Sequence, residues 1–150
     1  VYSSKPLEYQ GNLVEDFYLE FKNGKVVSYN AKKGKDILKG ILETDEGSSY
    51  LGETALVDIS SPIAKTNKIF LNTLIDENSC CHLALGQSFG ECIKGGLEKN
   101  QDELKQLGLN TSKNHVDFFI GTKDLTVEAV LKNGEKKMIM ENGNFKEENL

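Results

Sequence analysis

Two Asn-Gly pairs, each lying between extended apolar patterns, restrict the fold of this chain more than any other sequence feature. Residues 14–21 carry apolar side chains at alternate positions, Asn23-Gly24 follows, and an extended pattern resumes over 26–31. Asn-Gly favours a tight β-hairpin turn because both of its residues tolerate the positive φ that such turns require. We predict a second hairpin from 125–131 and 137–140, which flank Asn133-Gly134.

The remaining patterns predict further strands and two short helices. The spacing of apolar residues predicts an amphipathic helix over 35–44 and a short surface helix over 100–107, the latter begun by Asn100 or Asp102. We expect strands over 51–59 and 68–75 and a polar tail from Asn142 onward. Strands dominate, so the expected class is α+β, with a mainly antiparallel or mixed sheet that is curved or barrel-like and has two helices packed at its side.

Composition restricts the function classes. The 150 residues are 38% hydrophobic, enough for one domain with one core. The formal net charge of −5, with lysines and acids mixed along the chain, argues against a nucleic-acid binder. Because no apolar run approaches a membrane span of about 20 residues, we expect no membrane segment and a cytoplasmic location. The chain begins at Val1 without a methionine, so we expect a piece of a longer protein.

The cysteines indicate a reducing compartment rather than a disulfide framework. Cys80, Cys81 and Cys92 are an odd number, and the two adjacent ones could pair only with strain. A zinc site built on them is disfavoured, because the chain has no Cys-x-x-Cys and consecutive side chains of a strand cannot all face one ion. The usual role of a free cysteine, as a small buried apolar residue, is the main interpretation.

The strongest candidate for chemistry is the His115-Val-Asp117 segment. Two side chains that are two residues apart on a strand point to one face and can meet one cation. The alternative is a histidine and an acid that share a face of a surface strand by chance. His82 is the only other histidine, and a lone buried histidine is more often a satisfied core residue than a ligand. Glu53 completes a set whose spacings are too long to be local and which can converge only through the fold.

Three segments resemble the thermophilic metalloaminopeptidase family of the aminopeptidase T type, in the same order along the chain. They are Tyr50-Leu-Gly-Glu-Thr-Ala-Leu-Val57, Leu74-Ile-Asp-Glu-Asn-Ser-Cys-Cys-His-Leu-Ala-Leu-Gly86 and His115-Val-Asp-Phe-Phe-Ile-Gly121. The likeness runs over nearly the whole chain and covers the C-terminal part of the family. It implies that residues 1–150 are a single C-terminal, metal-binding domain of a longer metalloaminopeptidase.

This resemblance implies a ligand set and two departures from the family pattern. Glu53, His82, His115 and Asp117 match four of the five ligands of a site for two divalent ions, with zinc or cobalt expected. The fifth, a glutamate, would lie upstream of Val1, so the site is incomplete in this chain. Where the family has a tyrosine thought to stabilise the reacting carbonyl, the chain has Phe89, so no catalytic donor is intact. Tyr50 is the candidate that could donate this hydrogen bond in place of the missing tyrosine.

The expected function of the parent protein is hydrolysis of N-terminal residues from peptides. Because the family that it resembles is dimeric, we also expect a homodimer. The alternative is a catalytically impaired binding or dimerisation module that keeps the aminopeptidase fold. A third interpretation, a purely structural β domain, requires the four ligands to be accidental. Two interpretations of Asp76 and Glu77 also stay open: they orient the His82 imidazole, or they form a solvated turn that ends a strand.

Overall fold

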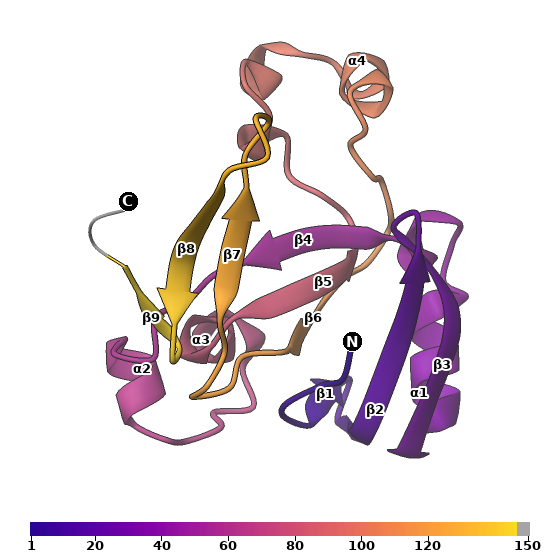
Figure 1. Ribbon diagram of the computed structural model, residues 1–150. Coiled ribbons are helices and arrows are strands. Elements are labelled where there is room, and N and C mark those ends of the chain that lie inside the picture. The colour runs from indigo at the N-terminus through magenta and orange to yellow at the C-terminus, as the bar shows by residue number, and fades with distance from the viewer. Residues whose placement is uncertain (147–150) are drawn as a thin grey trace.

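A computed structural model describes residues 1–146, and its strands form three antiparallel sheets of three strands each (Figure 1). The first sheet contains β1 (Leu7–Tyr9), β2 (Asn12–Lys22) and β3 (Lys25–Lys33). The second contains β4 (Leu51–Ala55), β5 (His82–Gly86) and β6 (His115–Phe119), with β5 in the centre. The third contains β7 (Val127–Val130), β8 (Lys136–Glu141) and β9 (Asn144–Phe145).

The helices are short, and the described residues contain four α-helices rather than the expected two. They are α1 (Lys35–Leu42), α2 (Pro62–Lys65), α3 (Thr73–Asp76) and α4 (Gln101–Gln106). Both expected helices are present, and Asn100 caps α4 by accepting hydrogen bonds from the backbone N–H groups of Asp102 and Glu103. None of the helices within residues 1–146 is long and apolar enough to cross a membrane.

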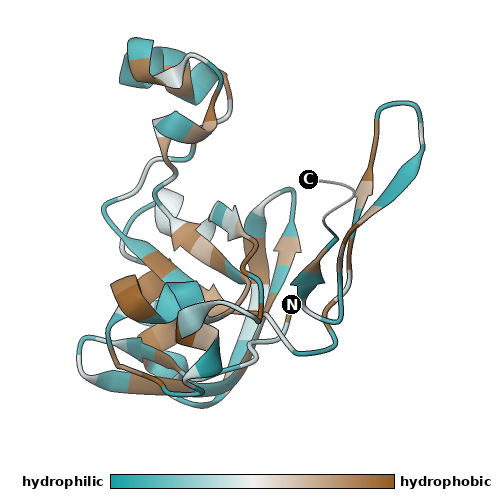
Figure 2. Cartoon of the chain, turned by 90° about the vertical axis from the view of Figure 1, so that its left-hand side faces the viewer, coloured by the Kyte–Doolittle hydropathy of each residue, from teal (hydrophilic) through white to brown (hydrophobic). Residues whose placement is uncertain are grey.

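Both predicted hairpins are confirmed. Asn23 and Gly24, with φ of 51° and 78°, connect β2 to β3, and the turn around Asn133-Gly134 connects β7 to β8. The antiparallel α+β class is likewise confirmed, but the sheets of residues 1–146 remain separate and do not close into a barrel. Figure 2 shows the β7–β8 hairpin and the segment that carries α4 diverging from the central strands.

Two predictions about local structure were wrong. The expected strand over 68–75 is a loop followed by α3, because the buried carboxylate of Asp76 accepts hydrogen bonds from the backbone N–H groups of Phe70 and Asn72 and folds the segment back. The expected polar tail begins instead with a third Asn-Gly turn, Asn142-Gly143, after which β9 pairs with β8. Residues 147–150 of that tail lie outside the described residues.

The hydrophobic core lies where α1 and the β1–β2–β3 sheet meet one face of the β4–β5–β6 sheet. Leu38 and Ile41 of α1 are buried against strand residues from both sheets, and the rings of Phe17 and Phe118 lie 5.9 Å apart between centroids. The strands of the second sheet therefore turn their alternate residues away from this core.

Close backbone packing of the second sheet depends on glycine. A Cβ atom added to Gly52 would lie 2.4 Å from the carbonyl oxygen of Gly86, and one added to Gly121 would lie 2.7 Å from the Cys81 nitrogen. Both distances are shorter than real contacts allow, so these positions exclude other residues. Cys80, Cys81 and Cys92 are all free, and the first two are buried, as expected for reduced thiols.

Candidate metal centre

Strand register brings the four predicted ligands to one face of the β4–β5–β6 sheet. Glu53 of β4 and Asp117 of β6 are both paired with Ala84 of β5, while His82 and His115 lie at the two ends of the β5–β6 pairing. Side chains two residues apart on a strand share a face, and paired residues of neighbouring strands share it as well. Glu53 and Asp117, which are far apart in the sequence, thus come close together because β4 and β6 flank the same strand, β5.

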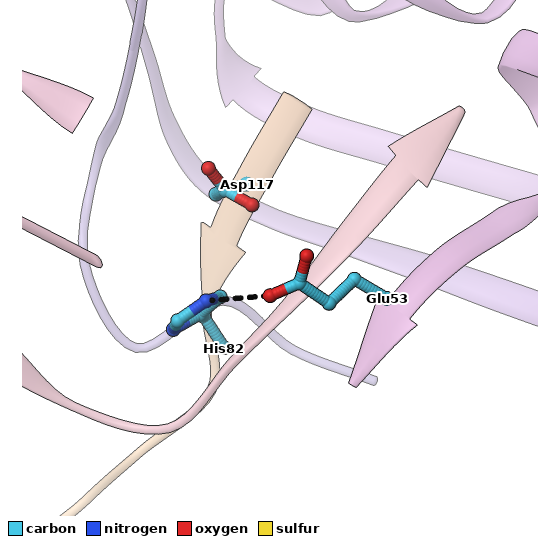
Figure 3. Close-up of side chains that lie close together, drawn as sticks. All are labelled: Glu53, His82 and Asp117. Carbon is cyan, nitrogen blue, oxygen red and sulfur yellow. Dashed lines mark hydrogen bonds and ion pairs between the residues drawn. The ribbon is translucent and has the colours of Figure 1, made fainter. Parts of the chain in front are cut away.

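The carboxylate of Glu53 lies between the two imidazoles. Its Oε1 atom is 3.3 Å from His82 Nε2, as Figure 3 shows together with Asp117. Its Oε2 atom is 3.4 Å from His115 Nε2. Asp117 Oδ1 is 3.1 Å from His115 Nε2. Ligand atoms of Glu53, His82 and Asp117 all lie within 4.8 Å of one another, a spacing at which they could hold one ion.

Backbone carbonyls orient both imidazoles with Nε2 toward the pocket. His82 Nδ1 lies 3.1 Å from the Cys80 carbonyl oxygen, and His115 Nδ1 lies 2.6 Å from that of Gln87. Because a carbonyl only accepts, each Nδ1 must carry the proton and donate it. In the neutral imidazole, Nε2 then presents its lone pair, which is the arrangement of histidine ligands in metal sites.

The buried Oδ1 atom of Asp117 tests whether these residues fit a metal ion. Asp117 is 5% exposed, and Oδ1 has no hydrogen bond of good geometry to any described residue. Its polar neighbour is His115 Nε2 at 3.1 Å, which satisfies this oxygen only when the histidine carries a second proton. Burying a carboxylate oxygen without a hydrogen bond or a counter-ion is costly, so such atoms usually meet a cation. Two imidazole nitrogens and two carboxylates are also donor types that zinc and related divalent ions accept. The residues fit a divalent ion.

The electrostatics of the pocket favour positive charge. The neighbouring Asp117 carboxylate raises the pKa of His115 from 6.5 to about 9, against the opposing effect of burial. The hydrogen bond to the Gln87 carbonyl and the charge of Glu53 act in the same direction as Asp117. A site that holds a proton this firmly on a histidine is one in which the carboxylates attract cations.

These side chains line a cavity of about 600 Å³, which also contains Glu77 and Phe89. The pKa of Glu77 is raised, chiefly because burial disfavours its charged form and also because of the negative charge of Asp117. Glu77 is therefore a carboxylate of the pocket and not part of a solvated turn. Neither of the two earlier interpretations of Glu77, a support for His82 or part of a solvated turn, placed it in the pocket as a further carboxylate, and its Asp-Glu-Asn segment carries no signal of this position.

The interpretation that Asp76 orients His82 was wrong. Both Asp76 oxygens accept backbone N–H groups of the loop before α3, and the Cys80 carbonyl supports His82 instead. The role of this carbonyl, and that of Gln87, could not be read from the sequence because every residue has a carbonyl group.

Phe89 lines the same cavity as the four ligands, and Tyr50 does not. The Phe89 ring lies 4.9 Å from the His115 ring between centroids. Tyr50 contacts Lys25, whose Nζ atom lies 5.4 Å from the ring centroid, and lines a different cavity beside Asp45. Tyr50 therefore does not supply the missing hydroxyl group at this pocket.

Comparison with known proteins identifies the family of the chain. The family model described as thermophilic metalloprotease (M29) matches residues 1–145. Aminopeptidase AmpS of Bacillus subtilis (strain 168) is 50% identical and aminopeptidase 2 of Geobacillus stearothermophilus 46% identical, each over 97% of this chain. The solved structure of wild-type AmpT from Thermus thermophilus superposes with a TM-score of 0.88 at 39% identity, again over 97% of this chain.

The chain spans 35% of the length of each of these relatives. The match over residues 1–145 nevertheless includes all four predicted ligands. The chain belongs to the thermophilic metalloprotease (M29) family.

Proposed function

We propose that the protein to which this chain belongs is a metal-dependent aminopeptidase that removes N-terminal residues from peptides. Its site would hold two divalent ions, zinc or cobalt, with Glu53, His82, His115 and Asp117 as ligands. Residues 1–150 would form the C-terminal metal-binding domain, and a glutamate upstream of Val1 would supply the fifth ligand. The names of the relatives, all aminopeptidases, support this activity.

One observation carries the proposal: two histidines present Nε2, and two carboxylates present oxygens, to one pocket from three adjacent strands. A structural role for these residues would not require Asp117 Oδ1 to be buried without a hydrogen bond. Nor would it require both Nδ1 atoms to be committed to backbone carbonyls.

Each residue would have a defined task. Divalent ions supply Lewis-acid polarisation of a carbonyl group and lower the pKa of water. The two imidazoles are neutral ligands, whereas Glu53 and Asp117 bring negative charge that offsets the cations. Glu53, whose two oxygens face different histidines, would contribute its charge on both sides of the pocket.

Glu77 is the carboxylate of the pocket that the ligand set does not use. A carboxyl group whose pKa is raised toward the working pH can accept a proton from water and donate it to the leaving amine. We propose this task for Glu77. Glu77→Gln should then lower kcat while leaving the zinc stoichiometry of the protein unchanged.

The proposed setting follows from the same comparison and from the composition. The substrate would be a peptide with a free N-terminus, and the protein would act as a homodimer in the cytoplasm, with neither nucleic acid nor membrane as a partner. Three free cysteines and a net charge of −5 support this setting.

Calorimetry with zinc or cobalt at about pH 7.5 tests the site itself. The chain should bind metal, and His115→Ala and Glu53→Gln should each weaken binding strongly. Glu91→Gln, which removes an exposed carboxylate outside the pocket, is the matched control. Equal heats for the chain and for His115→Ala would exclude the site.

A second candidate function rests on Phe89, which cannot donate a hydrogen bond to a reacting carbonyl group. Losing one such donor typically lowers turnover about 100- to 1,000-fold, so the domain could serve as a binding or dimerisation module with the aminopeptidase fold. Full-length protein assayed on an aminoacyl chromogenic substrate, with and without chelator, separates the two. Hydrolysis that chelator abolishes supports the enzyme, and metal binding without hydrolysis supports the module.

A further inference from the structure

A second cavity, of about 310 Å³, adjoins the metal pocket at Asp117. Thr73 and Asp117 line both cavities, so the two share part of their walls. The walls of the second cavity are mainly apolar, with Leu7, Leu13, Ile69, Leu71 and Phe119 among them. Its volume is at the lower end of the range of about 300–1,000 Å³ that is usual for small-molecule sites. We call it the Leu71 cavity.

One wall of the Leu71 cavity is a loop with a fixed and strained shape. The buried carboxylate of Asp76 accepts the backbone N–H of Phe70 at 2.8 Å and that of Asn72 at 3.1 Å. Between these two anchors, Leu71 has a φ of 54°, a conformation that is rare for a residue of its size. Backbone strain of this kind persists where surrounding contacts enforce it, and it is frequent at binding sites. The loop thus holds Ile69 and Leu71, 52% and 62% exposed, at the mouth of the cavity.

The charged residues of the Leu71 cavity are already engaged. Both oxygens of Asp76 accept hydrogen bonds from the loop, and Glu8 Oε1 accepts the backbone N–H of Gly11 at 2.6 Å. Asp117 is one of the proposed metal ligands. Since no lysine, arginine or histidine is among the described residues that line the cavity, an apolar group is the chemistry that its walls match.

We propose that the Leu71 cavity receives the apolar side chain of the substrate's N-terminal residue, an inference that rests on the aminopeptidase function proposed above. A substrate whose terminal peptide bond lies at the metal pocket must place the adjacent side chain within a few ångströms of it. The Leu71 cavity satisfies this condition through the shared residue Asp117. The preferred substrates would begin with leucine, methionine or phenylalanine rather than with a charged residue.

The Leu71 cavity has more buried lining residues than a neighbouring cavity, which suits it to the N-terminal residue of the substrate rather than to the rest of the peptide. Another cavity shares Glu53 and Phe89 with the metal pocket and has neither of the residues that the Leu71 cavity shares with it. Among the described residues that line that cavity only Leu109 is buried, whereas four lining residues of the Leu71 cavity are buried: Leu7, Asp76, Asp117 and Phe119. The substrate of an aminopeptidase has a single residue before the cleaved bond and the rest of the peptide after it. The Leu71 cavity, which is the more enclosed of the two, therefore suits the single N-terminal residue.

The test places a charge in the cavity of the full-length protein. Ile69→Asp should lower kcat/KM for leucyl p-nitroanilide relative to lysyl p-nitroanilide by at least about tenfold, because a pocket change as small as one methylene already discriminates by about 10- to 200-fold. Val130→Asp changes an apolar residue of similar exposure, 67%, away from the cavity and should leave this ratio unchanged. A ratio that Ile69→Asp also leaves unchanged would overturn the inference.

A second variant protects the test against misfolding. Leu71→Gly removes one wall while suiting the positive φ, and it should raise kcat/KM for a tryptophanyl substrate relative to a leucyl one. If instead another segment of the full-length protein covers the cavity, both variants will lower kcat/KM equally for all substrates and lower Tm, which contradicts the inference.

The outcome for the wild-type protein distinguishes this inference from the proposed function. Chelator-sensitive hydrolysis with ratios that no cavity variant changes rejects the Leu71 cavity alone. If the wild-type protein hydrolyses neither substrate, the aminopeptidase proposal fails. Calorimetry with leucine amide then tests whether the Leu71 cavity binds an apolar side chain. Ile69→Asp should weaken that binding at least about tenfold, and equal affinities would reject the cavity as well.

Discussion

The two faces of the β4–β5–β6 sheet use the same strands for opposite purposes. On one face, Leu83, Leu85, Val116 and Phe118 are between 1% and 8% exposed and pack in the core. On the other, the central strand presents the small residues Ala84 and Gly86, and the acids and histidines stand around them. Large side chains fill the first face, and small ones leave room for charged groups to converge above the second.

This difference shows how a short sheet separates stability from chemistry. Alternate residues of a strand point to opposite faces, so a substitution on one face leaves the other largely unchanged. The core face should determine the free energy of unfolding, and the site face should determine metal affinity. This separation can be tested by placing a large apolar residue on the site face or a small residue on the core face.

Ala84→Leu would give the site face a core residue and should have the largest effect on metal binding. Ala84 is 0% exposed and is paired with both Glu53 and Asp117, so the added side chain would occupy the space where the carboxylates meet. Zinc affinity measured by calorimetry should fall more than about 100-fold, beyond the loss of about 10- to 100-fold typical of changes outside the ligands. The chain should also lose about 1–3 kcal/mol of stability through overpacking.

The control for this variant is Ala129→Leu, since Ala129 lies in β7, outside the cavity that the four ligands line. Zinc affinity should not change there. An Ala84→Leu chain that folds and binds zinc as tightly as the original would disprove the idea that small central residues make room for the metal.

Phe118→Ala acts on the opposite face and should mainly change stability. Phe118 is 1% exposed and packs against Phe17, so the truncation should lower the free energy of unfolding by about 3–5 kcal/mol. Urea titration followed by circular dichroism measures this loss, and Leu97→Ala, at a residue that is 78% exposed, should change it by less than about 0.5 kcal/mol. Where the variant remains folded, zinc affinity should be retained. A selective loss of affinity would show that the faces are coupled.

Local sequence signals predicted the hairpins well, because an Asn-Gly turn is determined by the backbone of two residues. They failed over 68–75, where Ile69 and Phe70 imitate a strand. That segment is shaped by Asp76, whose buried carboxylate binds two backbone N–H groups, and no propensity scale contains such a contact. The signal at Asn142-Gly143 was the same as in the other two turns, but only two residues of β9 follow it, too few to show alternation.

The ligand set was predicted by resemblance, and the register of three strands explains why the ligands meet. From spacing alone, His115 and Asp117 could be assigned to one face, but nothing in the sequence states that β5 lies between β4 and β6. The groups that accept hydrogen bonds from the two imidazoles could not be predicted from the sequence for a different reason. They are carbonyl groups of Cys80 and Gln87, and the side chains of those residues carry no information about them.

Phe89→Tyr tests whether a hydroxyl group on the site face raises the rate of hydrolysis. The ring of Phe89 lies beside His115 in the cavity of the four ligands, so a hydroxyl group there could reach a carbonyl group bound in the cavity. In the full-length protein, kcat should rise by up to about 100-fold with little change in KM, as expected when a donor acts mainly in the transition state. Phe145→Tyr in β9, outside this cavity and the Leu71 cavity, should leave kcat unchanged, and an unchanged kcat in Phe89→Tyr would assign the task to another donor.

The pH dependence of stability should show the smallest effect and should arise from the site face. In the presence of chelator, folded His115 has a pKa of about 9, whereas the unfolded chain releases that proton near pH 6.5. The folded state therefore binds more protons between these values, so the contribution of His115 is complete below about pH 6.5 and is lost as the pH rises through about 9. Urea midpoints measured from pH 6 to 9.5 should fall across this window, and His115→Gln should flatten the fall while Phe118→Leu, on the core face, should not. In the proposed site, zinc would compete with the proton for Nε2, so the stabilisation by zinc should increase over the same window. If His115→Gln kept the full slope, another group would be responsible, and the positive charge favoured by the pocket would not reside on this histidine.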